Sequence, residues 1–266
     1  CAAAPAPAPP SAPASAPAAP VTAGPTAPID ARPIVAIASI PHPTDSFTQG
    51  LERAALPDGT EVLLESTGLV GESRLRLHDL DGGLLRDVAL PAEVFGEGAT
   101  TDGETVWVLT WRDGLVLRYS WPDLEPIDRL PLDGEGWGAC LDGDRLVTSD
   151  GSSSLALREP ATAEALERVE VRDGGEPVTE LNELECLGDG TAWANLWRSH
   201  ELVRIDLASG AVVDRLDASA LVAEADAAAG GLGPEDVLNG IAANPDGTLW
   251  LTGKRWPLVF LVDPAA

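Results

Sequence analysis

The sequence predicts an all-β fold, namely a five-bladed β-propeller closed by an N-terminal strand and carrying one short inserted helix. Two observations predict it. Five of the Asp-Gly pairs in the chain, at 58–59, 102–103, 142–143, 189–190 and 246–247, are each followed by a similar alternating strand, and helical periodicity is almost absent after residue 33. The glycines of successive pairs are 44, 40, 47 and 57 residues apart, so each interval has room for about four strands, the size of one blade. The alternative, a β-sandwich with a small second domain, does not require this register.

The strands that follow the Asp-Gly pairs form the second strand of each expected blade. They are expected at 60–64, 104–108, 144–147, 191–194 and 248–251. A third strand follows in every copy, as at 115–119 and 202–206. The last copy ends at 258–262 without residues for a fourth strand, whereas the apolar run 34–38 stands before the first copy. We therefore expect the N-terminal strand to complete the last blade, which leaves no open sheet edge.

The long last interval contains the one expected helix, at 219–229. A Ser precedes a run of helix-forming residues there, and Gly230-Gly231 ends the run. The helix is thus an insertion into the repeat pattern.

Cys140 and Cys186 come two and three residues before the Asp of successive copies. They therefore occupy near-equivalent places on the innermost strands of neighbouring blades, where a disulfide can form. The alternative is two buried free thiols.

The N-terminal region differs in composition from the rest. The chain begins at Cys1 and contains no Met, and residues 2–29 are nearly all Ala, Pro, Ser and Thr. It resembles a bacterial lipoprotein after removal of its signal peptide, with Cys1 carrying the lipid; chance trimming to a Cys is the alternative. We expect residues 1–32 to form a disordered tether and 33–266 the propeller domain. Such a tether would hold the propeller at the outer face of a bacterial cell membrane.

The charge limits the partners of the domain. With 43 Asp and Glu against 17 Lys and Arg, the net charge is -26, which repels a phosphate backbone or an anionic membrane surface. We therefore expect no nucleic-acid partner, and membrane contact only through a lipid on Cys1. No stretch approaches the ~20 apolar residues of a membrane-spanning helix.

Rare residue types fall in equivalent loops of the blades. Gln49 is the only Gln of the chain and Lys254 the only Lys. Loops leading into the innermost strands, and those joining second to third strands, meet at one mouth of a propeller. There we expect a bowl with aromatic walls, amides, one carboxylate and one ammonium, from Phe47, Phe95, Trp111, Trp137, Trp197, Gln49, Asn182, Asn239, Glu97 and Lys254.

Each residue of this bowl also has a structural interpretation. A Trp at a strand end can pack between blades, Asn and Gly serve turns, and Glu97 between two glycines can be a solvated acid. The three His are scattered over unrelated repeat positions, and no His or Cys pair has ligand spacing, so no metal site is predicted.

The motifs resemble the plant and bacterial glutaminyl-peptide cyclotransferases, a family of five-bladed propellers. They are Phe-Thr-Gln-Gly-Leu at 47–51, Glu-Ser-Thr-Gly-Leu at 65–69, Phe-Gly-Glu-Gly at 95–98, Gly-Trp-Gly at 136–138, Ser-Asp-Gly at 149–151, Leu-Asn-Glu-Leu-Glu at 181–185, Trp-Ala-Asn-Leu-Trp at 193–197, Leu-Asn-Gly-Ile-Ala at 238–242 and Thr-Gly-Lys-Arg-Trp-Pro at 252–257. Nine motifs in order and in register are highly specific. One departure is Val70, where the family tends to place Tyr, so the rim of the bowl differs.

The resemblance implies a metal-independent aminoacyltransferase without a cofactor. Its substrates are peptides or proteins with an N-terminal Gln, whose α-amine attacks its own side-chain amide to form pyroglutamate and release ammonia. By motif position Glu97 is the general acid and base. Lys254 and Gln49 are expected to donate hydrogen bonds to the oxyanion, and Asn182 to orient the substrate; these three roles are interchangeable at this stage.

Two other classes are compatible with parts of this pattern. The first is a non-catalytic, extracytoplasmic peptide-binding propeller, which need not keep Glu97, Gln49 and Asn182. The second is a metal-dependent propeller hydrolase such as a lactonase, in which carboxylates and amides converge on the channel axis. In this chain Glu97, Asn182 and Asn239 could imitate that arrangement.

Overall fold

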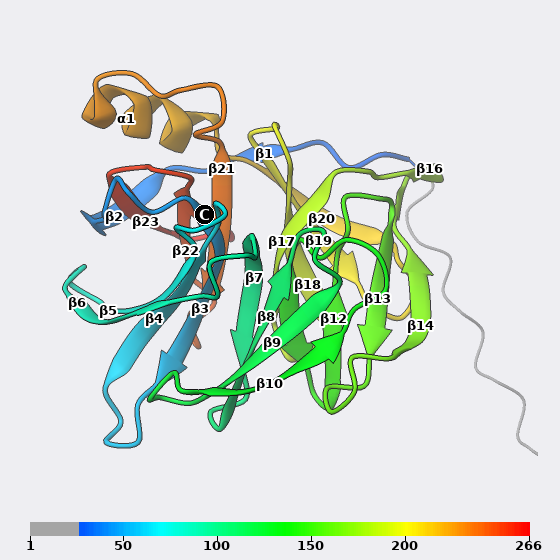
Figure 1. Ribbon diagram of the computed structural model, residues 1–266. Coiled ribbons are helices and arrows are strands. Elements are labelled where there is room, and N and C mark those ends of the chain that lie inside the picture. The colour runs from blue at the N-terminus through cyan, green and yellow to red at the C-terminus, as the bar shows by residue number, and fades with distance from the viewer. Residues whose placement is uncertain (1–26) are drawn as a thin grey trace, which may run out of the picture.

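Five β-sheets stand around a central axis in the computed structural model, which describes residues 27–266 (Figure 1). The innermost strands are β3 (Thr48–Ala55), β7 (Gly96–Thr101), β11 (Ala139–Asp142), β17 (Leu181–Cys186) and β21 (Leu238–Ala243). Each contacts the next, and β21 contacts β3 in turn, so the ring is closed. The five-bladed propeller predicted from the repeats is confirmed.

Each blade adds its strands outward by antiparallel pairing. Blade 1 continues with β4 (Glu61–Thr67), β5 (Arg74–Asp79) and β6 (Leu84–Ala89). Blade 2 continues with β8 (Thr105–Thr110), β9 (Leu115–Ser120) and β10 (Pro126–Pro131). Blade 3 continues with β12 (Arg145–Thr148), β13 (Ser154–Arg158) and β14 (Ala165–Glu170). Blades 4 and 5 continue with β18 (Thr191–Leu196), β19 (Glu201–Asp206) and β20 (Val212–Asp217); and β22 (Leu249–Gly253), β23 (Leu258–Val262) and β2 (Ala36–Pro41). A small hairpin, β15 (Arg172–Asp173) with β16 (Glu176–Pro177), follows blade 3.

The N-terminal segment closes the ring as predicted, with a shift in position. β2 pairs antiparallel with β23, but it begins at Ala36 rather than at Ile34. The reason is that β1 (Arg32–Pro33) first pairs in parallel with the outer strand β20 of blade 4. The backbone N–H of Ile29 also donates a hydrogen bond to Asp173 at 2.9 Å. Residues 29–32 of the expected tether therefore lie against the propeller; Cys1 lies outside the described residues.

Both faces of each blade are buried, which explains the nearly continuous apolar runs of the second strands. On β4, Val62 and Leu64 pack with residues of blade 2, whereas Leu63 points to the opposite face and packs with Trp250 and Val259 of blade 5. The outermost strands β6 and β10 are mostly exposed. The core is therefore a set of apolar layers between neighbouring blades.

The inserted helix α1 (Ser219–Ala229) has the predicted bounds. It ends at Gly230, whose positive φ of 73° allows its N–H to bond back to the last turn. Leu221 and Ala225 are buried against blade 5, in the same apolar cluster as Trp256. In Figure 1, α1 lies at the upper end of the propeller. No helix among residues 27–266 has the length and apolar character needed to cross a lipid bilayer.

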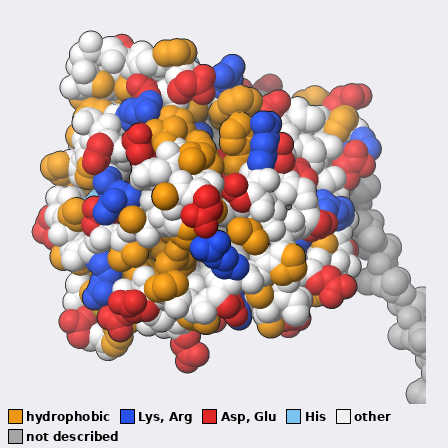
Figure 2. Space-filling view, in the orientation of Figure 1, with side chains coloured by type: hydrophobic (Ala, Val, Ile, Leu, Met, Phe, Trp, Pro, Cys, Tyr) orange, Lys and Arg blue, Asp and Glu red, His pale blue; other side chains and the backbone are white. Residues whose placement is uncertain are grey.

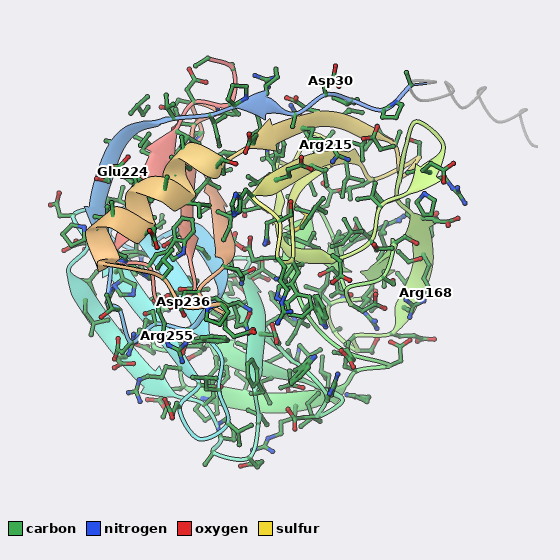
Figure 3. The ribbon with its side chains drawn as sticks, turned by 90° about the horizontal axis from the view of Figure 1, so that it is seen from above. Asp30, Arg168, Arg215, Glu224, Asp236 and Arg255 are labelled. Carbon is green, nitrogen blue, oxygen red and sulfur yellow. A yellow bond between two sulfur atoms is a disulfide. The ribbon has the colours of Figure 1, made fainter. Side chains whose placement is uncertain are left out.

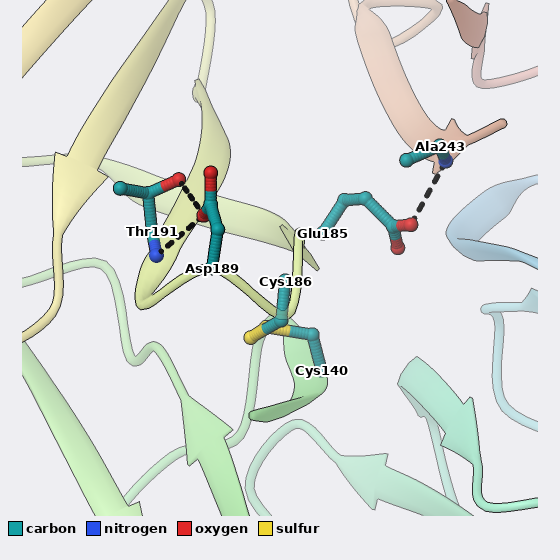
Figure 4. Close-up of a disulfide and its surroundings, with 6 residues drawn as sticks. All are labelled: Cys140, Glu185, Cys186, Asp189, Thr191 and Ala243. Atoms are coloured by element: carbon teal, nitrogen blue, oxygen red, sulfur yellow. Dashed lines mark hydrogen bonds between the residues drawn. A yellow bond between two sulfur atoms is a disulfide. The ribbon is translucent and has the colours of Figure 1, made fainter. Parts of the chain in front are cut away.

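Cys140 on β11 and Cys186 on β17 are joined by a disulfide (Figure 4). Their Cα atoms are 5.4 Å apart, and 46 positions separate them in the sequence. The bond links the innermost strands of blades 3 and 4 covalently.

Candidate active site

A cavity of about 290 Å³ opens at the end of the propeller where α1 lies. It is lined by Phe47, Gln49, Leu69, Phe95, Glu97, Trp111, Trp137, Asn182, Trp197, Glu235 and Lys254. We call these residues the bowl. Nine of the ten residues predicted for this site are among them, because residues from equivalent loops of all five blades meet at this mouth.

Four polar residues of the site are carried by irregularities in the innermost strands. The pairing with the second strand shifts register around Gln49, Glu97, Asn182 and Asn239, which lie on four different blades. Such β-bulges bend a strand and redirect a side chain that regular alternation would place elsewhere. The repeated bulges are therefore the local feature shared by Gln49, Glu97 and Asn182, which line the cavity, and by Asn239 beneath them.

Asn239 was expected in the wall of the bowl, but it does not line the cavity. Its side chain is fully buried beneath the bowl, and its Nδ2 donates hydrogen bonds to the carbonyl oxygen of Thr48 at 2.9 Å and to Oε1 of Gln49 at 3.2 Å. Its Oδ1 accepts a hydrogen bond from Nδ2 of Asn182 at 2.8 Å. Asn239 therefore positions two residues of the bowl instead of contacting the cavity.

These contacts form one continuous chain of hydrogen bonds. Asn182 donates to Asn239, Asn239 donates to Gln49, and Nε2 of Gln49 donates to Oε1 of Glu97 at 3.3 Å. Each amide in this series of hydrogen bonds is oriented by the bond that it donates to the following residue. The series ends at the Glu97 carboxylate, which can only accept hydrogen bonds. The second oxygen of Glu97 and Oδ1 of Asn182 are thereby left for a bound molecule.

Glu97 is buried at the start of β7, with 6% of its surface exposed. Burial raises the pKa of its carboxyl well above the ordinary value, the charge of Lys254 opposes this rise, and Glu135 adds to it. A carboxyl with a raised pKa can both accept and return a proton near neutral pH. This property is the one required of a general acid and base.

Lys254 follows β22 and is also 6% exposed. Its ammonium lies 4.9 Å from the centre of the Phe47 ring, and burial lowers its pKa while the charges of Glu97 and Glu235 oppose that change. Within residues 27–266 no hydrogen bond ties the ammonium down. Its N–H groups are thus available as donors inside the bowl.

The walls of the bowl are two groups of aromatic rings in edge-to-face contact. Phe95 lies between Phe47, at 6.3 Å, and Trp111, at 5.5 Å, and Trp137 lies 5.4 Å from Trp197. This geometry stabilises neighbouring rings and fixes their faces. The rings leave a rigid apolar slot above Glu97.

Glu135 connects the two aromatic groups and was not predicted from the sequence. Its Oε2 accepts hydrogen bonds from the indole N–H groups of Trp111 at 2.9 Å and Trp137 at 3.1 Å, and its Oε1 accepts one from Arg112 at 2.8 Å. Burial alone would raise the pKa of this carboxyl, but these donors hold it below its ordinary value. The available signal was its place in Gly134-Glu135-Gly136-Trp137.

Two lining residues were also missed. Leu69 belongs to the motif at 65–69, which was the available signal, and its positive φ of 84° places it on the rim. Glu235 comes from the segment after α1 and pairs with Arg198 at 2.7 Å. No local pattern indicated Glu235, because its place depends on the path of the chain after the insertion.

In three blades a residue on or directly after the second strand supports the site segment of the next blade. Ser66 donates to the carbonyl oxygen of Glu97 at 2.6 Å, Ser149 to that of Asn182 at 2.5 Å, and Asn195 to that of Leu238 at 2.9 Å. The Ser and Asn residues of the motifs thus hold the bulged strands in place.

The glycines beside Glu97 and Trp137 permit close approach of neighbouring innermost strands. A Cβ at Gly98 would lie 2.6 Å from the backbone nitrogen of Ala139, and one at Gly138 would lie 2.1 Å from the carbonyl oxygen of Asn182. Any side chain at these positions would push the innermost strands apart. The Gly-Glu-Gly and Gly-Trp-Gly motifs therefore reflect packing at the channel.

A buried charge cluster anchors the segment that carries Phe47 and Gln49. Glu65 accepts hydrogen bonds from His42 at 2.9 Å, His78 at 3.0 Å and Thr48 at 2.7 Å. Burial alone would raise the pKa of Glu65, but the two His hold it far below its ordinary value. Nδ1 of His42 also contacts the carbonyl oxygen of Trp256 at 2.7 Å, so the cluster ties this segment to the loop of Lys254.

Metal-ligating residues do not gather in the described part of the chain. Among residues 27–266 no group of three or more His, Cys, Asp or Glu side chains is arranged to hold a metal ion. On the face shown in Figure 2, Lys and Arg side chains stand among Asp and Glu rather than forming a continuous basic surface.

Comparison with known proteins places this geometry in a family. The family model described as glutamine cyclotransferase matches residues 11–263. A glutaminyl-peptide cyclotransferase of Arabidopsis thaliana is 35% identical over 232 residues, which cover 86% of this chain and 70% of the relative. The crystal structure of Myxococcus xanthus glutaminyl cyclase superposes with a TM-score of 0.79 at 38% identity, covering 88% of this chain and 97% of that one. The chain therefore belongs to the glutamine cyclotransferase family.

Proposed function

We propose that the bowl converts the N-terminal Gln of peptides or proteins to pyroglutamate, with Glu97 as the general acid and base. The protein is a glutaminyl-peptide cyclotransferase by its family, its relatives and its fold. The observation that carries the residue assignment is the buried Glu97 carboxyl, held by Gln49 and facing an aromatic slot that also contains Lys254 and Asn182.

The size of the cavity suits the N-terminal residue alone. At about 290 Å³ it lies at the lower limit of small-ligand pockets. Its rigid aromatic walls restrict the Gln side chain to the compact conformation in which the α-amine faces its own amide carbon. Because nucleophile and electrophile already belong to one molecule, the walls contribute by restricting the bond rotations that would separate them.

The first step is attack by the neutral α-amine on the side-chain amide carbon. A bond forms between these atoms, and the amine proton passes to the free oxygen of Glu97. Oδ1 of Asn182 accepts a hydrogen bond from the amine and orients it; one N–H of Nδ2 donates to Asn239, and this bond fixes the orientation of the Asn182 amide. Burial raises the pKa of Glu97, which makes its carboxylate a stronger base for this proton.

The second step is collapse of the tetrahedral intermediate. The bond from carbon to the amide nitrogen breaks, Glu97 returns its proton to that nitrogen, and ammonia leaves. The ammonium of Lys254 stabilises the negative oxygen of the intermediate, since it is desolvated and has no other hydrogen bond among residues 27–266. Removal of one such donor lowers the rate of other enzymes by about 10²–10³.

Gln49 was expected to donate a hydrogen bond to the oxyanion, but its contacts indicate a different main role. One of its two N–H bonds is directed to Glu97, so its main role is to orient the carboxylate. Its second N–H remains for the substrate amide.

The direct test is incubation with a dipeptide that begins with Gln, following ammonia release and the accompanying loss of mass. A matched dipeptide with a blocked α-amine is the control, because it lacks the nucleophile. Nothing in the bowl favours a non-catalytic peptide-binding protein, since Glu97, Gln49 and Asn182 are all present. Binding of the dipeptide without ammonia release would support that alternative.

We further propose an extracytoplasmic location and a lipid anchor on Cys1 in a bacterial cell. The disulfide between Cys140 and Cys186 supports an oxidising compartment, and the Ala- and Pro-rich segment 2–29 suits a spacer. The test is fractionation of cells that express the protein with its signal peptide. Recovery in the membrane fraction that is lost in C1S supports the anchor, and equal release of both forms contradicts it.

A further inference from the structure

A second cavity, of about 480 Å³, lies directly beside the bowl. It runs between one face of α1, residues 198–200 and the segment that follows α1, and we call it the α1 groove. Its lining is Arg198, Ser199, His200, Ser219, Val222, Ala223, Asp226, Leu232, Gly233, Asp236, Val237 and Leu238. Figure 3, which looks down on this end, places Asp236 between α1 and the centre of the propeller.

The α1 groove and the bowl share their border. Arg198 lines the groove and pairs at 2.7 Å with Glu235, which lines the bowl. Asp236 lines the groove and pairs at 3.1 Å with Arg255, whose guanidinium stacks over the Phe47 ring of the bowl. A chain leaving the bowl across this border therefore enters the groove.

The wall of the groove after α1 is held rigidly. Asp226 accepts a hydrogen bond from the backbone N–H of Leu232 at 2.7 Å, and Asp236 accepts one from that of Gly233 at 2.8 Å. The indole N–H of Trp256 donates to the backbone oxygen of Asp236 at 2.8 Å. A preformed surface binds a flexible chain with a smaller entropic cost than a mobile one.

The chemistry of the groove suits a peptide. Val222, Leu232 and Leu238 provide apolar surface, while Arg198 and Glu235 at the border present a donor and an acceptor. These two side chains are 55% and 50% exposed, so their ion pair contributes little and can exchange partners at low cost. A peptide backbone carries the matching N–H and carbonyl groups.

We propose that the α1 groove binds the residues that follow the N-terminal Gln of a peptide substrate, with apolar side chains favoured at the second to fourth positions. The inference rests on the proposed function. The bowl is sized for the N-terminal residue, so the rest of the substrate must cross its rim, and the groove is a cavity adjacent to that rim at the Arg198–Glu235 pair. The groove therefore makes longer, apolar peptides better substrates than dipeptides.

The test compares Gln-Ala amide with Gln-Ala-Leu-Leu amide in the wild type, A223W and A228W. Both alanines are exposed on α1, but only Ala223 lines the groove, so A228W is a matched control. We expect kcat/KM of the wild type to be about tenfold higher for the tetrapeptide, the effect of burying one apolar side chain. A223W fills the groove and should bring this ratio close to one, whereas A228W should keep it.

Equal ratios in the wild type, A223W and A228W would overturn the inference. A wild-type ratio near one would overturn it as well. Both outcomes leave the proposed function standing, because the dipeptide is still cyclised. Absence of ammonia from both peptides in the wild type would instead overturn the proposed function and the inference with it.

Discussion

Nε2 of Gln49 donates a hydrogen bond to Oε1 of Glu97 at 3.3 Å, and through this contact the only Gln of the chain orients the buried carboxyl to which we assign the proton transfer. The contact is the last of three successive hydrogen bonds that begin at Asn182. Asn182 and Glu97, to which we assign substrate orientation and proton transfer, therefore belong to one connected network, whose geometry depends on the buried Asn239.

The charge of Lys254 should set the pH at which Glu97 becomes active. Lys254 stabilises the Glu97 carboxylate, so K254M should raise the pKa of Glu97 further. Because the base must be deprotonated, the acid limb of kcat/KM should move to higher pH, in addition to a fall in the maximum of about 10²–10³. The measurement is kcat/KM against pH with one dipeptide.

K254R is the control for this shift, since it keeps the positive charge. The substrate amine, with a pKa of about 7.7–8.0, contributes equally to all profiles. An acid limb of K254M that stays in place, or moves to lower pH, would contradict the electrostatic role.

Asn239 should act on catalysis without touching the substrate. N239D keeps the oxygen that accepts from Asn182 but loses the donors to Thr48 and Gln49. We expect kcat to fall about 10²-fold with little change in KM, because displacement of Gln49 misaligns Glu97. The matched control is N244D, which makes the same change on the same blade at a side chain that bonds Thr248. Equal kcat in both variants would show that Asn239 has no positioning role.

Glu185 should destabilise the protein at higher pH. It is buried on β17, and burial first, then the charge of Glu52, raises its pKa well above the ordinary value; burial also raises the pKa of Glu52 to about 7. In the folded protein such carboxyls keep their protons, whereas in the unfolded chain they lose them above the ordinary pKa of about 4.3 for a Glu carboxyl. The folded state therefore loses stability relative to the unfolded state as the pH rises through the pKa of the folded carboxyl.

E185Q removes this charge while its side-chain oxygen can still accept the hydrogen bond from Ala243 (Figure 4). Its melting temperature should exceed that of the wild type at pH 8, and the difference should shrink at pH 5. Each kcal/mol corresponds to about 2–4 °C for a domain of this size. E176Q, at an exposed position, should show no such trend. A difference that is equal at both pH values would exclude the buried charge as its cause.

The disulfide should stabilise the fold without taking part in the reaction. The loop entropy for a separation of 46 residues corresponds to about 4 kcal/mol, so C140S/C186S should unfold at a lower denaturant concentration. Addition of a reductant during unfolding should shift the wild type toward this variant and leave the variant unchanged. A wild type that ignores the reductant would show that the disulfide contributes nothing to stability.

Short sequence patterns were sufficient to predict the propeller architecture. The Asp-Gly turns fix where each second strand begins, and Ser219 with Gly230 marks the two ends of α1, so these features were predicted closely. Equivalent positions in a repeat occupy equivalent places in space, which is why residues as distant as Gln49 and Lys254 were correctly brought together.

Features that depend on side-chain direction or on the path of an insertion were not predictable. Asn239 occupies the same repeat position as Asn182, and each donates a hydrogen bond to the polar residue of the next blade, yet only Asn182 also lines the cavity. Glu235 reaches the bowl only because the segment after α1 returns across the mouth. Glu135 bridges two indoles that no sequence pattern pairs.

Replacement of Glu97 by Gln tests the central claim most directly. E97Q retains an acceptor for Gln49 and removes the buried charge, so the fold should be kept and the melting temperature should not fall. Ammonia release from a Gln-initiated dipeptide should drop by about 10²–10⁴, the usual contribution of a general acid and base. A folded E97Q protein that releases ammonia at the wild-type rate would contradict the account.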